Sequence, residues 1–253
     1  MVFAMFKLSV CILTFNSSRL LREVLPPLLR LADEMIIVDS GSTDSTLDIC
    51  REFGVTPVYQ HFVTHSQQMN DAIARASHEW VLCMDSDEIM NHEMVEAILK
   101  LKQNAEPVES AAFCLSRHWF VLNQPVRVIY PVSSPDFPVR LFNKNVVHFN
   151  NMPVDDSAEG YSTTHILPGE VRHDTFYSLH EVFTKLNGYT TRVVNHKDIR
   201  PSISRGFLSA FGAFWKWYVF SGAWREGKVG VVTGLYATLY SFLKYFKAWY
   251  KKA

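Results

Sequence analysis

Short apolar runs and amphipathic stretches alternate along the first hundred residues of the chain. The apolar runs have the length of strands and lie at residues 7–14, 35–38, 55–59 and 79–84. Between them, apolar residues recur every three or four positions, as in helices, at 18–31, 43–53 and 67–76. Strands that alternate with helices at this spacing indicate βαβ units, so we expect an α/β fold with a mostly parallel sheet.

The first predicted helix carries signals for both its start and its interruption. Ser17 or Ser18 can cap its N-terminus, because a side-chain oxygen there accepts a hydrogen bond from a free backbone N–H. Pro26 and Pro27 fall in its middle, where proline removes a backbone donor and its ring clashes with the preceding turn. We therefore expect the prolines to kink or split this helix.

The pattern changes after residue 110. Short β segments separated by Pro, Asn and Ser are predicted at 111–117, 126–130, 139–142 and 166–172, as mixed strands and loops that cover a site. A helix at 178–196 is followed by two aromatic-rich helical stretches at 206–224 and 230–250. We expect an α/β domain over residues 1–200 and a helical extension over 201–253.

Composition narrows the class of protein. Of the 253 residues 48% are hydrophobic and 20% charged, which provides for a core and argues against disorder. Basic and acidic residues cancel at 25 each, so no nucleic-acid partner is expected. The four cysteines form no C-x-x-C pair, which argues against structural zinc and favours a reducing compartment. Lys7 interrupts the apolar N-terminus, which reads as a first strand rather than a signal peptide, so we expect a cytoplasmic protein.

An acidic turn follows the apolar run at 80–84. Asp85, Asp87 and Glu88 lie within four positions, and clustered carboxylates raise one another's pKa unless a cation lies among them. Oxygen ligands favour Mg²⁺ or Mn²⁺ over Zn²⁺, and such a metal usually completes its shell with substrate phosphates. The alternative interpretation is a solvated acidic turn at the end of a strand.

Polar loops also follow the first two predicted strands. Thr14-Phe15-Asn16 ends the first, and the segment 39–44 (Asp-Ser-Gly-Ser-Thr-Asp) ends the second. Glycine at position 41 permits a tight turn, and the free N–H groups of the helix that follows attract anions. Ligands of parallel sheets bind beyond the carboxyl ends of the strands, so a site is expected where these loops meet the acidic turn.

Together these segments resemble the inverting family-two glycosyltransferases of the GT-A fold. The resemblance runs from residue 8 to about residue 101. It implies a nucleotide-sugar site formed by Thr14, Phe15, Asn16, Asp39, Ser40, Gly41, Gln68, Asn70 and Asp85. Within that site Asp39 would hold the uracil or the ribose, Asp85 would face the ribose, and Asp87 would bind the metal.

A later block is most similar to the bacterial lipopolysaccharide-core β-glucosyltransferases. It is carried by His173, Asp174, Thr175, Phe176, Ser178, Leu179, His180, Glu181, Lys185, Asn187, Tyr189 and Thr190. The resemblance implies His173 as a further metal ligand and Lys185 as a donor-binding residue; a purely structural histidine is the alternative. It also implies UDP-glucose as donor, a lipid-linked core saccharide as acceptor, and a place on the inner face of the bacterial inner membrane. A transferase for another cell-envelope glycan is the alternative.

The catalytic base is implied where the chain departs from these relatives. They usually carry Val-His-Glu, whereas this chain has Val154-Asp155-Asp156. Asp156 would inherit the role of the glutamate, with Asp155 as the rival carboxylate. Aspartate is one methylene shorter, so the loop must compensate. The base would take the proton of the acceptor hydroxyl in a single displacement that inverts the anomeric centre.

The aromatic C-terminal stretches suggest a membrane surface. Residues 206–224 are rich in Phe and Trp around one internal charge, Lys216, and residues 230–250 carry an apolar stripe flanked by Lys244, Lys247 and Lys251. Basic amphipathic helices of this kind dock at lipid interfaces. Two helices that pack on each other and on the core, or a true membrane span, are the alternatives.

Two other classes of protein compete with a glycosyltransferase. A sugar nucleotidyltransferase would carry a Gly-rich loop after its first strand, where this chain has Thr14-Phe15-Asn16-Ser17-Ser18. A non-catalytic nucleotide-sugar-binding protein would tolerate the altered Val-His-Glu motif. Metal-dependent hydrolysis of a nucleotide sugar separates the transferase from the binding protein.

Overall fold

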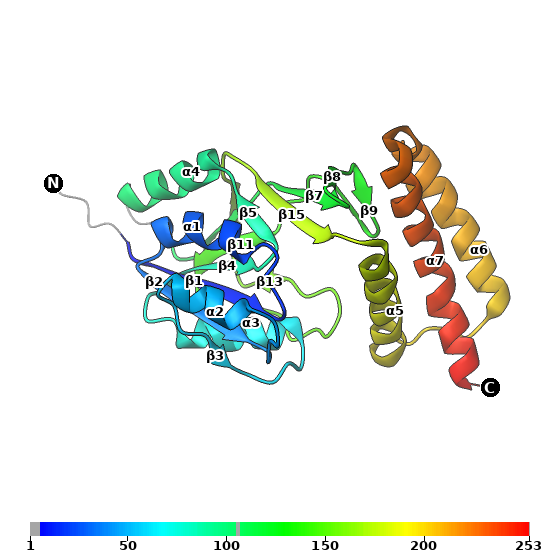
Figure 1. Ribbon diagram of the computed structural model, residues 1–253, viewed down its shortest axis with the longest axis horizontal. Helices are drawn as coiled ribbons and strands as arrows, with labels where there is room; N and C mark the ends of the chain where they lie inside the picture. Colours follow the sequence, from blue (N-terminus) through cyan, green and yellow to red (C-terminus); the bar gives the residue numbers. More distant parts are fainter. Residues whose placement is uncertain (1–5, 105–106, 253) are drawn as a thin grey trace. The chain divides into compact units, whose positions relative to one another are not determined.

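The computed structural model describes residues 6–104 and 107–252, which form two compact units (Figure 1). The first unit comprises the described residues up to Arg117 together with Phe137–His173. The second comprises His118–Asp136 and the residues from Asp174 onward. The bounds of these units differ from the two domains expected from the sequence, residues 1–200 and 201–253. The division into those two domains stays a prediction.

A seven-stranded sheet in the order β14-β6-β11-β4-β1-β2-β3 forms the centre of the first unit. Its strands are β1 (Leu8–Thr14), β2 (Glu34–Asp39), β3 (Val58–Tyr59), β4 (Trp80–Asp85), β6 (Ala111–Cys114), β11 (Val139–Asn143) and β14 (Thr163–Ile166). β11 is antiparallel to both of its neighbours, and the other pairs are parallel. The expected α/β fold with a mostly parallel sheet is confirmed.

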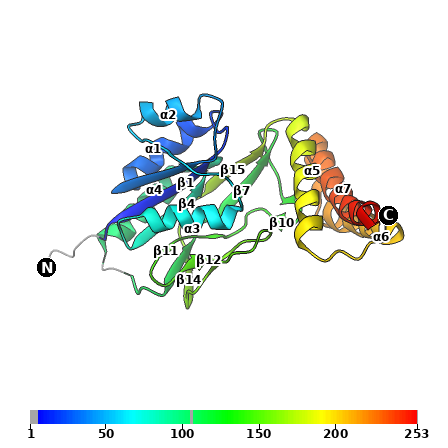
Figure 2. The same ribbon diagram turned by 90° about the horizontal axis from the view of Figure 1, so that it is seen from below.

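Alternate residues of the central strands enter two separate cores. Leu8, Val10 and Ile12 of β1 pack on one face, beneath helices α1 (Leu21–Leu31), α2 (Thr46–Glu52) and α4 (His92–Gln103). Cys11 points to the opposite face, which α3 (His65–Arg75) covers together with the hairpin of β12 (His148–Phe149) and β13 (Ala158–Glu159). Figure 2 shows α1 and α3 on opposite sides of β1 and β4. The predicted strands β1 and β4 are therefore buried on both faces, whereas Val58 and Tyr59 of the edge strand β3 are exposed.

Helix α1 differs from its prediction at both signals. It is one helix with both prolines inside, and its N-cap is Leu20, which makes no side-chain capping bond. Pro26 is exposed, so the carbonyl group that its missing N–H leaves without a partner can be hydrated. The inner side buries Leu21, Val24, Leu25, Leu28 and Leu31, which holds the helix together across the prolines. The prolines therefore do not split the helix, and the expected serine cap was wrong; a kink at the prolines stays a prediction.

The second unit is mainly helical. It contains α5 (Leu179–His196), α6 (Ile203–Phe214), a π-helical turn (Trp215–Phe220), a 3-10 turn (Ala223–Glu226) and α7 (Gly227–Lys252). Ser178 caps α5, and α7 lies against both α5 and α6 (Figures 1 and 2). Short strands β8 (Gln124–Pro125), β9 (Val128–Ile129) and β10 (Val132–Ser133) complete it. The chain passes between the units three times: in β7 (Arg117–Val121), between Asp136 and Phe137, and in β15 (Val171–Phe176).

None of the helices in the described part of the chain is both long and apolar enough to cross a membrane.

Candidate active site

The register of the parallel strands brings the three polar segments to one edge of the sheet. Thr14 is paired with Asp39, and Leu13 with Asp85, so the strand ends coincide. Asn16 links the first two loops, since its N–H donates to Ser42 Oγ at 2.8 Å and its Oδ1 accepts from the backbone N–H of Thr43 at 2.9 Å. The first loop is also joined to the acidic turn by its serine, Ser17, whose Oγ lies 2.7 Å from Ser86 Oγ.

Asp39 orders the loop that follows its own strand. Its carboxylate accepts hydrogen bonds from Gly41 N at 2.9 Å, Ser42 N at 2.8 Å, Ser42 Oγ at 2.6 Å and Thr14 Oγ1 at 2.8 Å. The side chain is buried, and four protein donors occupy its two oxygens. Gly41 has φ of 99°, a conformation that the turn needs and that other residues rarely adopt. A contact between Asp39 and a nucleotide stays a prediction.

Helix α3 supplies polar side chains beside these loops. Gln68 Nε2 donates to Ser40 Oγ at 2.9 Å. Asn70 forms two bonds with the backbone of Phe149, one from Phe149 N and one to Phe149 O, at 2.9 and 2.8 Å. Phe15 is 61% exposed, so its ring can stack on a planar ligand. Gln68 thus joins α3 to the loop after β2, and Asn70 joins α3 to β12.

Asp85 belongs to a buried network of charges. Arg140 Nη2 lies 2.6 Å from both Asp85 Oδ2 and Glu88 Oε1, and Arg117 Nη1 lies 2.9 Å from Glu88. Burial raises the pKa of Asp85, but Arg140 and then His65 hold it well below its usual range. Glu88 is almost fully buried and paired with both arginines, so it is not available to a ligand at the tip of the strand. Asp85 stays ionised because of these neighbours.

His65 joins Asp85 to Asp156. Its Nε2 lies 3.0 Å from Asp85 Oδ1 and its Nδ1 lies 2.6 Å from Asp156 Oδ2. Burial lowers the pKa of His65, but the two carboxylates raise it to about 10, so the imidazole carries both protons at neutral pH. Burial likewise raises the pKa of Asp156, yet the hydrogen bond to His65 keeps that pKa below its ordinary value. The loop that carries Asp156 is therefore tied to the acidic turn.

Sequence reasoning did not single out His65 or Arg140. His65 is the first residue of α3, directly after the capping Thr64, and Arg140 is the one charged residue in the β-strand segment Val-Arg-Leu-Phe-Asn. A charged side chain in an otherwise apolar strand is a signal that could have identified Arg140, since buried charges are normally paired. No local signal points to His65, because its partners lie 20 and 91 positions away.

We expect the stabilising effect of His65 to disappear as the pH rises. The imidazole of the unfolded chain loses its proton near pH 6.5, whereas the folded protein keeps it until about pH 10. The side chain is 32% exposed, which weakens the ion pairs. His65→Gln should lower the free energy of unfolding by about 1–2 kcal/mol at pH 6, and this deficit should shrink between pH 6.5 and 10. Denaturant unfolding across this range measures it; a deficit independent of pH would contradict the charged pair.

The two residues expected to bind a metal lie together. His173 Nε2 is 3.2 Å from Asp87 Oδ1, and both side chains belong to the first unit. Over residues 6–104 and 107–252, no group of three or more His, Cys, Asp or Glu side chains is arranged to hold a metal ion. The pair nevertheless fits a divalent ion that takes a carboxylate oxygen and an imidazole nitrogen from the protein and its other ligands from substrate phosphates and water.

Two expected site residues take no part in the contacts described above. Asp155 is exposed, with φ of 63°. The carboxylate that contacts His65 Nδ1 is that of its neighbour, Asp156. Lys185 is on α5 in the second unit, where its Nζ donates to Thr175 O at 2.7 Å and lies 3.3 Å from Glu181 Oε1. Its role in donor binding stays a prediction.

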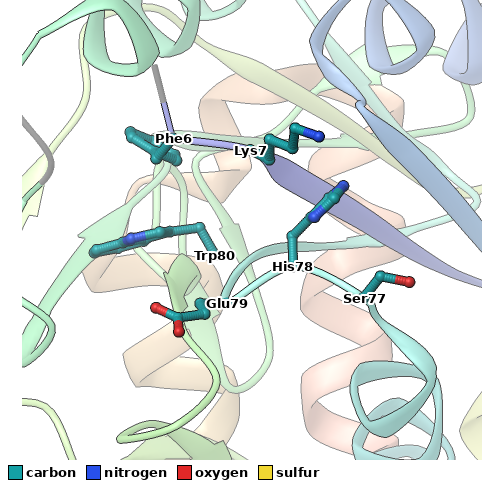
Figure 3. A pocket seen from close by; sticks show the side chains of 6 residues that line it. All are labelled: Phe6, Lys7, Ser77, His78, Glu79 and Trp80. Atoms are coloured by element: carbon teal, nitrogen blue, oxygen red, sulfur yellow. The ribbon is translucent and has the colours of Figure 1, made fainter. Parts of the chain in front are cut away.

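A shallow pocket opens at the opposite edge of the sheet. It is lined by Phe6, Lys7, Ser77, His78, Glu79 and Trp80, at the amino ends of β1 and β4 (Figure 3). Ligands of parallel sheets bind at the carboxyl ends, so this pocket is separate from the candidate site.

Comparison with known proteins agrees with this geometry. Residues 9–117 match the family model of Glycosyl transferase family 2, and this segment contains β1, β2, β4 and the three polar loops. The match and the sheet topology together confirm the GT-A type of α/β fold. The narrower likeness to lipopolysaccharide-core β-glucosyltransferases stays a prediction.

Several curated proteins are similar to the chain at low identity. A TPR repeat-containing protein of Synechococcus elongatus is 31% identical over 45% of this chain and 28% of its own length. The uncharacterized glycosyltransferase RP128 of Rickettsia prowazekii is 23% identical over 73% of the chain and 66% of its own length. LpsC of Rhizobium meliloti, a lipopolysaccharide core biosynthesis glycosyltransferase, is 22% identical over 97% of the chain and 93% of its own length. The chain thus spans between 28% and 66% of the length of the first two relatives.

The chain also matches solved structures at low identity. The match to the structure of S. aureus TarS 1–349 covers 97% of this chain and 91% of the TarS chain, with 16% identity and a TM-score of 0.45. A second match is to glucosyl-3-phosphoglycerate synthase of Mycobacterium tuberculosis, solved in complex with Mn²⁺ and UDP-glucose. It covers 46% of this chain and 44% of the synthase chain, with 20% identity and a TM-score of 0.37.

Proposed function

We propose that the protein is an inverting hexosyltransferase that moves glucose from UDP-glucose to a lipid-linked saccharide of the lipopolysaccharide core. The observation that carries the proposal is the carboxyl edge of the sheet, where an Asp87–His173 pair lies beside an Asp85–His65–Asp156 chain of ion pairs. The Asp87–His173 pair suits a diphosphate with its metal, and the chain of ion pairs ends in the ionised carboxylate of Asp156. The family-two match over residues 9–117 and the similarity to LpsC support this function.

The donor would lie across the loops at the ends of β1, β2 and β4. The exposed ring of Phe15 is suited to stacking on uracil, and the loop that Asp39 orders presents backbone and hydroxyl groups to the nucleoside. Asp85 is ionised and held by Arg140, so it can accept a hydrogen bond from a ribose hydroxyl without moving. Lys185 is proposed as a further donor-binding residue on the basis of the resemblance.

Asp87 and His173 would hold Mn²⁺ or Mg²⁺ together with the diphosphate. A bound divalent ion stabilises the negative charge that develops on a departing diphosphate. The protein would contribute a carboxylate and an imidazole whose nearest atoms are 3.2 Å apart. The phosphate oxygens would bind the ion that these two groups hold. The imidazole favours Mn²⁺, because Mg²⁺ prefers an all-oxygen shell.

Asp156 would act on the acceptor. Its carboxylate takes the proton of the acceptor hydroxyl while that oxygen forms a bond to the anomeric carbon. The bond from the anomeric carbon to the diphosphate breaks, and UDP leaves with the electron pair. The attack from the opposite face converts an α-linked donor into a β-linked product. His65 positions Asp156 and keeps it ionised, with Asp155 as the rival base.

The acceptor determines where the protein would act. A lipid-linked core saccharide is exposed at the inner face of the bacterial inner membrane, so we infer that the protein works there as a peripheral protein. Transfer to another cell-envelope glycan is the alternative that the acceptor test separates.

The test is a screen of the purified chain with UDP-glucose, UDP-galactose and UDP-N-acetylglucosamine, with and without Mn²⁺. We expect UDP release from UDP-glucose that depends on the metal and increases with truncated lipopolysaccharide as acceptor. Pyrophosphate formation from UTP and glucose 1-phosphate would indicate a nucleotidyltransferase instead. Tight donor binding without turnover on any acceptor would indicate a non-catalytic binding protein.

A further inference from the structure

The outer face of α6 is apolar and exposed. Its largest side chains are Phe207, Leu208 and Phe211, which are 62%, 72% and 65% exposed, and Phe220 in the π-helical turn is 79% exposed. Trp215, one helical turn beyond Phe211, is 40% exposed. Single exposed leucines are normal in folded proteins, but a contiguous group of large apolar side chains marks a surface that another body covers.

The opposite side of α6 is used for packing inside the second unit. Gly206 lies so close to α7 that an added Cβ would be 3.2 Å from the ring of Phe242, and the rings of Phe207 and Phe242 are 5.0 Å apart. Ala213 is buried on the same side. The helix therefore contacts α7 through small residues and through the ring of Phe207, which is still 62% exposed, whereas Leu208 and Phe211 face outward.

The lysines of α7 are engaged differently from what the sequence predicted. Lys247 Nζ lies 2.7 Å from Asn187 O, Thr190 Oγ1 and Thr191 Oγ1 of α5. Lys251 Nζ lies 3.2 Å from Asn195 Oδ1. Because these two lysines join α7 to α5, they are not the basic side chains beside the apolar face of α6.

Such side chains flank α6 itself. Arg205 and Lys216 are exposed and lie three helical turns apart, and no acidic residue occurs between positions 199 and 225. An apolar face with basic side chains at its border matches the interface of a bilayer with anionic headgroups. In a twofold dimer the same face would meet itself, and Arg205 and Lys216 of two chains would approach with no acid in this segment to neutralise them.

We propose that the face formed by Phe207, Leu208, Phe211, Trp215 and Phe220 is a docking surface for a lipid bilayer that contains anionic lipid. α6 lies in the plane of the interface, its aromatic side chains enter the boundary between headgroups and acyl chains, and Arg205 and Lys216 bind headgroup phosphates. This docking surface rests on the proposed function and deepens it, because it assigns to one helix the contact with the membrane that holds the lipid-linked acceptor. Its test does not depend on turnover.

The test is flotation of the full chain with vesicles of phosphatidylcholine, alone or with phosphatidylglycerol. Leu208→Ser/Phe211→Ser should weaken binding to both kinds of vesicle by about tenfold or more, because the apolar contact is lost. Arg205→Gln/Lys216→Gln should weaken binding about tenfold or more on the anionic vesicles only, and salt should have the same effect. A matched control, Val108→Ser/Ile166→Ser, removes side chains that are 74% and 60% exposed in the first unit and should bind like the wild type.

Two outcomes would overturn the proposal. One is vesicle binding that the Leu208→Ser/Phe211→Ser variant retains in full. The other is a wild-type dimer in sedimentation that this variant dissociates, without any vesicle binding, which would assign the face to a second copy of the chain. UDP-glucose binding, measured in the same samples, should be equal in all variants. A protein that floats but does not turn over a nucleotide sugar would refute the proposed function and leave the docking surface standing.

Discussion

Replacement of Asp156 by Asn is expected to reduce glucosyl transfer by a factor of about 10² to 10⁴ while donor affinity is retained, which is the usual contribution of a positioned base. Asparagine has nearly the same shape but cannot accept a proton. The carboxylate is held 2.6 Å from His65 Nδ1, and the amide can keep a contact with that nitrogen. The measurement is UDP release at saturating acceptor, with calorimetric donor binding on the same preparation.

The matched control for this prediction is Asp155→Asn. Asp155 is the adjacent residue on the same loop, is exposed, and is not the carboxylate that contacts His65 Nδ1. We expect it to lose less than about threefold in transfer, since a surface carboxylate that does not contact the reacting hydroxyl contributes little. A loss in Asp155→Asn alone would identify the other carboxylate as the base. Full transfer in both variants would exclude base catalysis by this loop.

His65 affects the same step through Asp156. The protonated imidazole keeps the pKa of Asp156 below its usual range, so the base is ionised throughout the neutral range. A carboxylate with a lowered pKa is a weaker base, but it is deprotonated and held in place when the acceptor arrives. His65→Gln should therefore move the acidic limb of the pH–rate profile to higher pH, because Asp156 then loses the charge that favours its ionised form.

The strands and the edge at which polar loops meet could be predicted because both follow from local pattern. Buried strands in a parallel sheet are continuous apolar runs, and their carboxyl ends coincide once the strands are in register. Thr14, Asp39 and Asp85 were located by this argument, and the structure brings their loops together. A split of α1 at its prolines was wrongly expected as one of two outcomes, because a rule for helix interiors does not say which side of the helix meets water.

The side-chain partners in the site could not be predicted from pattern. His65 reaches Asp156 across 91 positions and Arg140 reaches Asp85 across 55, and only the folded chain decides which charges are brought together. The α7 lysines illustrate the same limit. Periodicity shows that Lys247 lies off the apolar stripe, but it does not show that α5 covers this side of the helix.

Replacement of Asp87 by Asn is expected to abolish the Mn²⁺-dependent part of UDP-glucose binding and to leave the fold intact. The carboxylate is one of two protein groups proposed to hold the metal, and its oxygen lies 3.2 Å from His173 Nε2. An amide oxygen carries no charge and binds a divalent cation far more weakly than a carboxylate does. The side chain is 26% exposed, so removal of its charge should lower the free energy of unfolding by no more than about 1 kcal/mol.

Calorimetric titration of UDP with and without Mn²⁺ measures this effect. In the wild type Mn²⁺ should tighten UDP binding, and in Asp87→Asn the two titrations should coincide. His173→Gln should weaken the metal effect to a lesser degree, because the carboxylate remains. Asp48→Asn on α2 is the matched control, since that carboxylate is exposed and paired only with Arg51 in a surface contact. A metal effect that Asp87→Asn retains in full would remove Asp87 from the site and with it the proposed binding of the diphosphate by the Asp87–His173 pair.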